Sequence, residues 1–123
     1  MVNSNDESLD RSQLVKGVLD LAVLSALSQE DGYGYDVVRR LRSAGLVDVA
    51  EASVYGTLRR LFATGMLSSY VVASDEGPHR KYYGLTPVGR DSIAAQRDQW
   101  VAFCEVINTI IKTSDEVTPE LII

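Results

Sequence analysis

The segment from residue 14 to residue 27 constrains the fold more than any other part of the chain. A helix built from it would carry apolar side chains on almost every side: Leu14, Val15, Val18, Leu19, Leu21, Ala22, Val23, Leu24, Ala26 and Leu27. A helix that is apolar all round must be covered on more than one face. Because 123 residues leave room for only one domain, a second subunit is one source of that cover.

The same segment is not predicted to span a membrane, because four residues interrupt it: Lys16, Gly17, Asp20 and Ser25. Residues 1–13 are polar and acidic, and they show neither the basic nor the apolar part of a signal peptide. We expect them to form a flexible N-terminus. The single cysteine, Cys104, has no partner for an intramolecular disulfide, which is typical of a reducing compartment. The predicted location is therefore the cytoplasm.

Two more helices are predicted before residue 65. The first follows a turn cluster at residues 32–35 and ends at Gly45. The second covers residues 51–64 and turns Val54, Leu58 and Leu61 inward. Its opposite face carries Ser53, Thr57, Arg60 and Thr64, with Arg59 beside them. Hydroxyls and arginine suit base edges and phosphates in a major groove, so this face is predicted to read DNA.

A β-hairpin is predicted after these helices. Residues 67–73 are rich in β-prone side chains, a Gly-Pro turn follows, and the chain returns through residues 79–85. Arg80 and Lys81 begin the return strand, within reach of a sugar-phosphate backbone. Three helices followed by a hairpin is the order of a winged helix-turn-helix, in which the third helix enters the major groove. The predicted fold class is therefore mainly α with a small β-hairpin, with the winged domain at residues 14–86.

A long final helix is predicted over residues 87–113, beginning with Thr86 as N-cap and Pro87 at its first position. Such a helix, about 39 Å long, exceeds what so small a domain can bury alone. Its apolar residues repeat every seven positions and predict a dimerisation seam: Ile93, Trp100, Phe103, Ile107 and Ile110. The alternative is that the helix folds back as an ordinary core element. Residues 114–123 are left as a short tail.

The charges are distributed unevenly along the chain. The net charge is −5 at neutral pH, yet residues 39–90 hold eight cations against four acids. Both ends are acidic. A basic centre can hold phosphates locally while acidic ends limit nonspecific binding. Arginines on solvated helix faces explain the same pattern, so charge alone decides nothing.

With these motifs in place, the chain resembles the PadR family of bacterial transcriptional regulators over residues 14–111. The segments that carry the resemblance are Gly32-Tyr33-Gly34-Tyr35, Ser53-Val54-Tyr55-Gly56-Thr57-Leu58-Arg59-Arg60-Leu61, and Arg80-Lys81-Tyr82-Tyr83-Gly84-Leu85-Thr86-Pro87-Val88-Gly89. The resemblance implies a homodimeric winged-helix repressor with a single C-terminal dimerisation helix. It also implies that Tyr55 contacts the DNA backbone. Gly56 stands where the family often has proline. Trp100 lies near the position where some members stack a planar effector between subunits.

The predicted function is repression of a promoter by a homodimer bound to palindromic double-stranded DNA, with release by a small-molecule effector near Trp100. The predicted DNA contacts are Ser53, Tyr55, Thr57, Arg59, Arg60, Thr64, Arg80 and Lys81. The alternative is a winged-helix module that contacts only proteins. If Arg59, Arg60, Arg80 and Lys81 neutralise phosphates in both subunits, the logarithm of affinity should fall against that of salt with a slope of about −7.

No enzyme, cofactor or metal site is predicted. His79 and Cys104 are the only residues of their kinds, and no motif frames a nucleophile or cradles a phosphate. His79 with Asp75 and Glu76 is more simply a solvated turn than a metal site.

Overall fold

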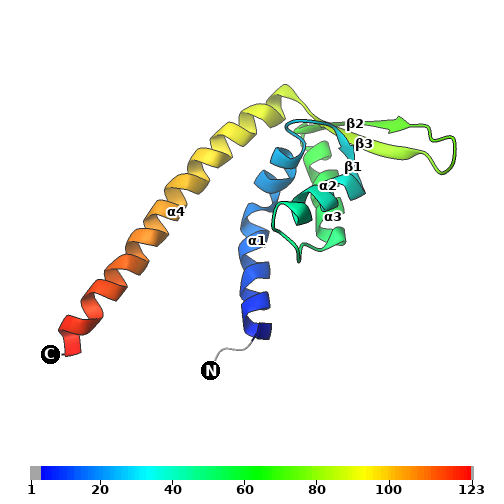
Figure 1. Ribbon diagram of the computed structural model, residues 1–123. Coiled ribbons are helices and arrows are strands. Elements are labelled where there is room, and N and C mark those ends of the chain that lie inside the picture. The colour runs from blue at the N-terminus through cyan, green and yellow to red at the C-terminus, as the bar shows by residue number, and fades with distance from the viewer. Residues whose placement is uncertain (1–3, 123) are drawn as a thin grey trace. The chain divides into compact units, whose positions relative to one another are not determined.

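The computed structural model describes the backbone of residues 4–122 and the side-chain surroundings of residues 11 and 13–115. Its elements follow in the order α1 (Ser4–Ala26), β1 (Gly32–Tyr33), α2 (Gly34–Ser43), α3 (Glu51–Ala63), β2 (Leu67–Val72), β3 (Arg80–Leu85) and α4 (Pro87–Ile122) (Figure 1). Residues 1–93 and 94–123 form two compact units, and the boundary falls within α4. The predicted fold class, mainly α with a small hairpin, is confirmed.

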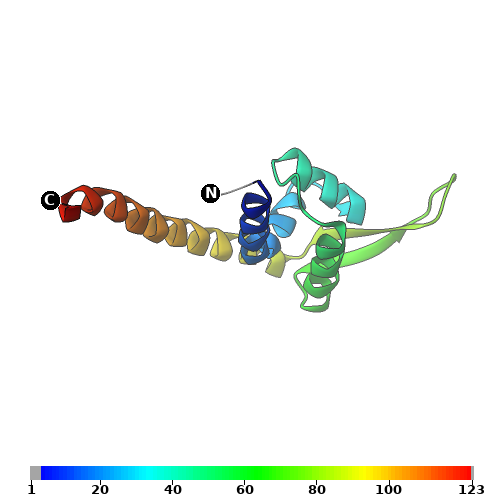
Figure 2. The same cartoon turned by 90° about the horizontal axis from the view of Figure 1, so that it is seen from below.

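The sheet contains one strand more than the sequence predicted. β2 and β3 form the expected antiparallel hairpin, from Leu67 opposite Leu85 to Val72 opposite Arg80. β1 pairs with the other edge of β3 and gives the strand order β1-β3-β2. Residues 32–33 are thus a short strand where only a turn was predicted. The hairpin extends beyond the helices of the first unit in both views (Figures 1 and 2).

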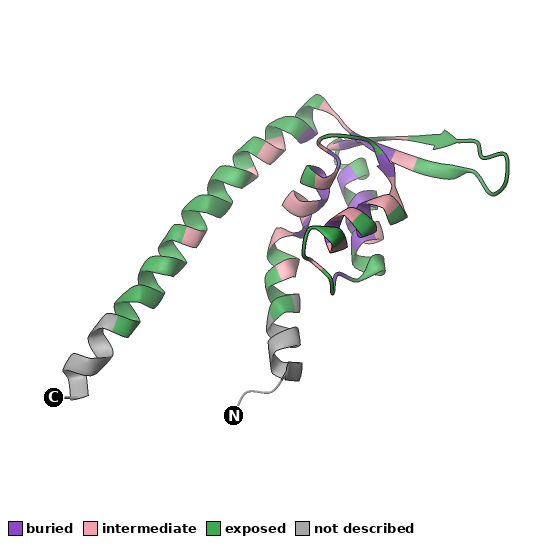
Figure 3. Ribbon diagram, viewed as in Figure 1, coloured by how far each residue is buried: buried purple, intermediate pink, exposed green. Residues whose placement is uncertain are grey.

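The core lies where α1, α2 and α3 pack against one another and against one face of the sheet. Buried residues gather on the facing sides of these elements (Figure 3). They are Leu19, Val23, Leu24, Leu27, Val37, Val38, Leu41, Val49, Val54, Leu58, Leu61, Leu67 and Tyr83. All three residues predicted to face inward from α3 are among them. On α1, by contrast, Leu14 stays exposed, so this chain covers only part of that apolar helix.

The helix ends follow from local chemistry. The Asp36 carboxylate accepts a hydrogen bond of 3.2 Å from the Tyr33 amide, which satisfies a free donor where α2 begins. Gly65 follows α3 with a φ of +83°, a conformation that glycine adopts without strain. The Thr86 hydroxyl accepts a hydrogen bond of 3.1 Å from the Gly89 amide at the start of α4. This is the N-cap that the sequence predicted.

Two motif glycines are explained by close approach of other groups. A Cβ at Gly34 would lie 2.1 Å from Cε1 of the Tyr55 ring, so the ring packs directly on the start of α2. A Cβ at Gly89 would lie 2.2 Å from the backbone oxygen of Met66. Neither position has room for a side chain, and each glycine therefore fixes how one element docks on another.

Two helices are longer than predicted, and one is slightly shorter. α1 begins at Ser4 and α4 continues to Ile122, so helix replaces most of the predicted flexible N-terminus and of the tail after residue 113. Residues 1–13 are polar and offer no apolar periodicity from which a helix could be predicted. α3 ends at Ala63. Within the described chain, no helix combines the length and the apolar character needed to cross a bilayer.

Candidate nucleic-acid interface

The exposed face of α3 is rotated from the face that the sequence predicted. Thr57 is only 7% exposed and belongs to the buried side of the helix with Val54 and Leu58. Its predicted contact with base edges therefore has little exposed surface to support it. An exposed line of α3 runs through Ala52, Arg59 and Ala63, which share one face at helical spacing.

The two adjacent arginines of α3 have different surroundings. Arg60 forms a bidentate ion pair with Asp20 of α1, with nitrogen–oxygen distances of 3.0 and 2.5 Å. Hydrogen bonding to Asp20 raises the pKa of Arg60 above its ordinary value. Arg59 is exposed and makes no ion pair with any residue that the structure describes. Arg59 is thus the α3 cation that is open to an external anion.

The other polar residues predicted on α3 lie at its two ends. Ser53 is exposed in the first turn. Thr64 follows the last turn, and its hydroxyl donates a hydrogen bond of 3.1 Å to the carbonyl of Leu61. Thr64 therefore closes the helix end, whereas Ser53 is open to solvent.

Tyr55 is half-buried beside the exposed face of α3. Burial raises the pKa of its phenol, and the nearby Glu51 carboxylate and the Tyr35 and Tyr33 hydroxyls raise it further. The phenol therefore stays protonated and able to donate a hydrogen bond at neutral pH. Such a donor suits a phosphate oxygen, and the contact of its ring with Gly34 fixes where it lies.

The two cations of the hairpin point to opposite faces, as neighbours on a strand must. Lys81 lies on the α3 side, with its ammonium 5.3 Å from the ring centre of Phe62 and 5.6 Å from that of Tyr83. Arg80 lies on the other side, 4.6 Å above the ring of Tyr33. Lys81 thus lies on the side of the hairpin that faces α3, the helix that carries Arg59, whereas Arg80 lies on the opposite face.

Three residues of α2 and α3 were not predicted as part of the site from the sequence: Tyr35, Arg39 and Phe62. Arg39 on α2 stacks over the Tyr35 ring at 5.5 Å and pairs with Asp36, which raises the pKa of Arg39. Phe62 is exposed beside Lys81. The four-residue spacing of Tyr35 and Arg39 on a helix was a signal available in the sequence. Phe62 gave none, because an apolar residue near a core stripe is usually assigned to the core.

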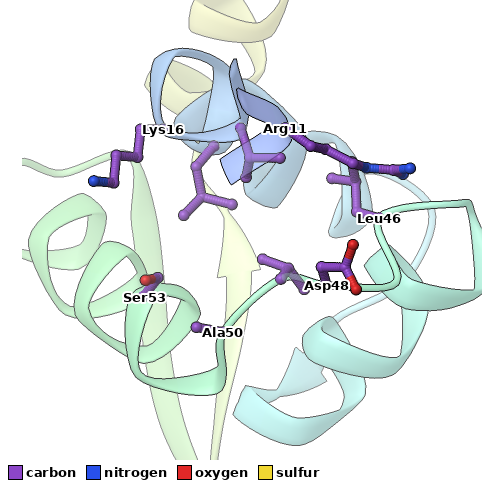
Figure 4. Close-up of a pocket in the computed structure, with 9 residues that line it drawn as sticks. Arg11, Lys16, Leu46, Asp48, Ala50 and Ser53 are labelled. Carbon is purple, nitrogen blue, oxygen red and sulfur yellow. The ribbon is translucent and has the colours of Figure 1, made fainter. Parts of the chain in front are cut away.

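A small pocket separates the N-terminal half of α1 from the start of α3. It encloses about 300 Å³, and its lining is apolar at the centre and polar at the rim: Arg11, Val15, Lys16, Leu19, Leu46, Asp48, Val49, Ala50 and Ser53. In Figure 4 the side chains of Arg11 and Lys16 extend to opposite sides of the opening. Arg11 donates a hydrogen bond to the carbonyl of Gly45. The first turn of α3 therefore borders this opening at Ser53, while Val54 of the same turn is buried in the core.

The second unit carries four of the residues that were predicted to form the dimerisation seam. Trp100, Phe103, Ile107 and Ile110 are all exposed, and the rings of Trp100 and Phe103 lie 6.5 Å apart. Ile93 differs, because it packs half-buried against the core of its own chain. Only part of Ile93 therefore remains open to a partner, and its place in the dimer seam stays a prediction. No group of three or more potential metal ligands occurs among the described residues.

Comparison with known proteins gives a consistent result. The family model described as "Transcriptional regulator PadR-like family" matches residues 23–95. A PadR family transcriptional regulator from Eggerthella lenta is 28% identical, with a TM-score of 0.79 over 87% of this chain and 93% of that one. A PadR-like regulator from Bacillus cereus is 32% identical, with a TM-score of 0.70 over 80% of this chain and 96% of that one.

The Bacillus subtilis PadR protein, solved in complex with operator DNA, is similar in fold. Its TM-score is 0.59 at 21% identity, over 64% of this chain and 46% of that one.

Proposed function

Because the chain belongs to the PadR-like family of transcriptional regulators, a DNA-binding family without enzymatic function, we propose that it represses a promoter by binding a palindromic site as a homodimer. α3 of each subunit enters a major groove, and the hairpin contacts the flanking backbone. A repressor acts where the chromosome lies, which places it in the cytoplasm.

One observation carries this proposal: Arg59 is exposed on α3 without an ion pair among the described residues, and Lys81 lies on the α3 side of the hairpin. We assign Arg59 and Ser53 to base edges and nearby phosphates, and Tyr55 to the backbone. Lys81 and Arg80 hold the flanking strand. Arg60 is committed to Asp20 and is assigned no direct contact.

Homodimerisation follows from apolar surface that one chain leaves exposed. The seam of Trp100, Phe103, Ile107 and Ile110 exposes large apolar side chains to water, which is typical of a surface that binds a partner. A second copy supplies an identical seam, and a two-fold dimer matches two half-sites about one helical turn apart. An effector that stacks on Trp100 between the subunits would change the half-site spacing and release the DNA.

The test is to retain genomic fragments from the source organism on the purified protein and to sequence them. Enrichment of a short palindrome supports the proposal. Affinity for the enriched duplex is then measured against salt concentration. Three cations in each subunit, Arg59, Arg80 and Lys81, predict a logarithmic slope of about −5 for the dimer. No enrichment, or a slope near zero, would leave the alternative of a winged-helix module that binds only proteins.

A further inference from the structure

Asp20 and Arg60, which are forty positions apart in the sequence, join α1 to α3. Both side chains are partly exposed, 39% for Asp20 and 55% for Arg60, so the pair lies at the surface where α1 meets α3. Its two nitrogen–oxygen contacts form a planar fork, which fixes direction as well as distance.

The inward residues of α3 contribute no directional bond to α1. Val54, Leu58 and Leu61 are aliphatic, so they hold α3 in the core by close packing, and their side chains form no hydrogen bond with α1. Ser53 in the first turn lines the pocket together with Val15 and Leu19 of α1. Among the described residues, the bidentate pair is therefore the directional contact between these two helices.

We propose that Asp20 is a positioning residue for DNA binding: by holding Arg60 against α1 it sets the rotation of α3, so that Arg59 and Ser53 face the groove. The proposal rests on the function proposed above. Arg59 and Arg60 are neighbours, so they project about 100° apart around a helix. A rotation of α3 that frees Arg60 would carry Arg59 away from the outward line that it now occupies with Ala52 and Ala63.

The sign of one substitution separates positioning from simple electrostatics. Asp20→Asn removes a negative charge from a DNA-binding protein, which by charge alone strengthens binding to DNA. Loss of a positioning contact has the opposite effect. Asp48→Asn is the matched control, because Asp48 is an exposed carboxylate that lines the pocket between α1 and α3 and makes no ion pair with a described residue.

The experiment measures affinity of wild type and variants for the duplex that the wild type enriches, and for a scrambled duplex, over a range of salt. We expect Asp20→Asn and Arg60→Gln each to weaken specific binding by about threefold to tenfold in the dimer. The double variant should be no weaker than either single one, and the exchange Asp20→Arg with Arg60→Asp should restore part of the loss. Asp48→Asn should bind as tightly as the wild type or more tightly.

Comparing the salt slopes of Asp20→Asn and Arg60→Gln distinguishes positioning from direct contact. A positioning role gives the two variants the same slope, because both lose the same contact. Direct contact of Arg60 with phosphate would lower the magnitude of the slope by about 1.8 in the dimer for Arg60→Gln alone and would overturn the proposal. Equal or tighter binding by Asp20→Asn would overturn it as well.

Failure of the proposed function is recognised separately, because then the wild type itself enriches no duplex. In that case the effect of the Asp20–Arg60 pair on α3 is measured by the amide chemical shifts of the protein without DNA. Asp20→Asn and Arg60→Gln must displace the same α3 resonances, and Asp48→Asn must leave them in place. Different patterns for the two variants overturn the positioning role.

Discussion

Two neighbouring arginines of α2 are expected to respond differently to the same substitution. The Arg40 guanidinium donates three hydrogen bonds to the backbone between α1 and β1, at 3.0 Å to the carbonyl of Ala26, 2.7 Å to that of Glu30 and 2.9 Å to that of Asp31. Arg39 instead lies on the surface, paired with Asp36 one turn earlier. We predict that Arg40→Met destabilises the fold and that Arg39→Met does not.

The magnitude follows from these contacts. The bond to Ala26 is partly buried and contributes about 1.5 kcal/mol, and the two exposed bonds contribute about 0.5–1 kcal/mol each. The ion pair with Glu30 adds about 0.5 kcal/mol or less, because it spans 3.6 Å and the Glu30 side chain is 82% exposed. Releasing the Arg40 side chain returns about 1 kcal/mol of conformational entropy. The expected loss in the free energy of unfolding is therefore about 2 kcal/mol.

Urea unfolding measures both variants at one fixed protein concentration, since the stability of the proposed dimer would depend on concentration. Methionine keeps much of the aliphatic stem in each case, so the comparison isolates the guanidinium. Arg39→Met should change the free energy of unfolding by less than about 0.5 kcal/mol. Equal losses in the two variants would refute the reasoning, because the backbone contacts of Arg40 would then contribute nothing specific.

Three further predictions rest on single contacts. Gly34→Ala should lower the free energy of unfolding by about 1–3 kcal/mol, because its Cβ clashes with the Tyr55 ring. In a Tyr55→Ala background the same substitution should cost nearly nothing. Equal losses in the two backgrounds, measured by urea unfolding, would contradict the contact. Gly89→Ala should destabilise the fold, because the new Cβ would meet the backbone oxygen of Met66. Gly17→Ala in α1 should instead stabilise the fold by about 0.5–1 kcal/mol in the same assay, because its Cβ would meet no atom within 4 Å. Tyr70 donates a hydrogen bond of 2.6 Å to Asp31, which raises the pKa of Tyr70. This bond should contribute fully to the free energy of unfolding at any pH below the pKa of an unfolded tyrosine. The contribution should be lost as pH rises through the pKa of Tyr70 in the folded protein. Unfolding of wild type and Tyr70→Phe at neutral and alkaline pH checks this, and a constant difference would count against it.

The fold was predictable where the sequence is periodic or carries turn chemistry. Val54, Leu58 and Leu61 marked the inward side of α3, and Thr86 with Pro87 marked the start of α4. β1 was missed because a strand of two residues has no period to detect. It exists through pairing with β3, a partner about fifty residues further along the chain.

The site was less predictable, because three inward residues give the direction of a buried face but not its width. α3 packs against α1, α2 and β2, and this broad cover also buries Thr57. The distinction between Arg59 and Arg60 depends on Asp20, which no local pattern connects with α3. For the same reason the side on which Lys81 lies could be predicted only once the face of the sheet that meets α3 was known.

The basic middle of the chain acquires a different meaning when each cation is followed to its partner. Arg40 and Arg42 donate to backbone carbonyls, Arg42 to that of Val49 at 3.0 Å, and Arg60 pairs with Asp20. These three cations stabilise the fold, so a count of charges in the sequence overstates what the surface offers to phosphate. Few cations then act on DNA in a chain whose net charge is −5. Long-range attraction is correspondingly weak, and affinity must come from contacts that are correctly placed. In such a protein, residues that orient α3 matter to binding as much as residues that touch the DNA.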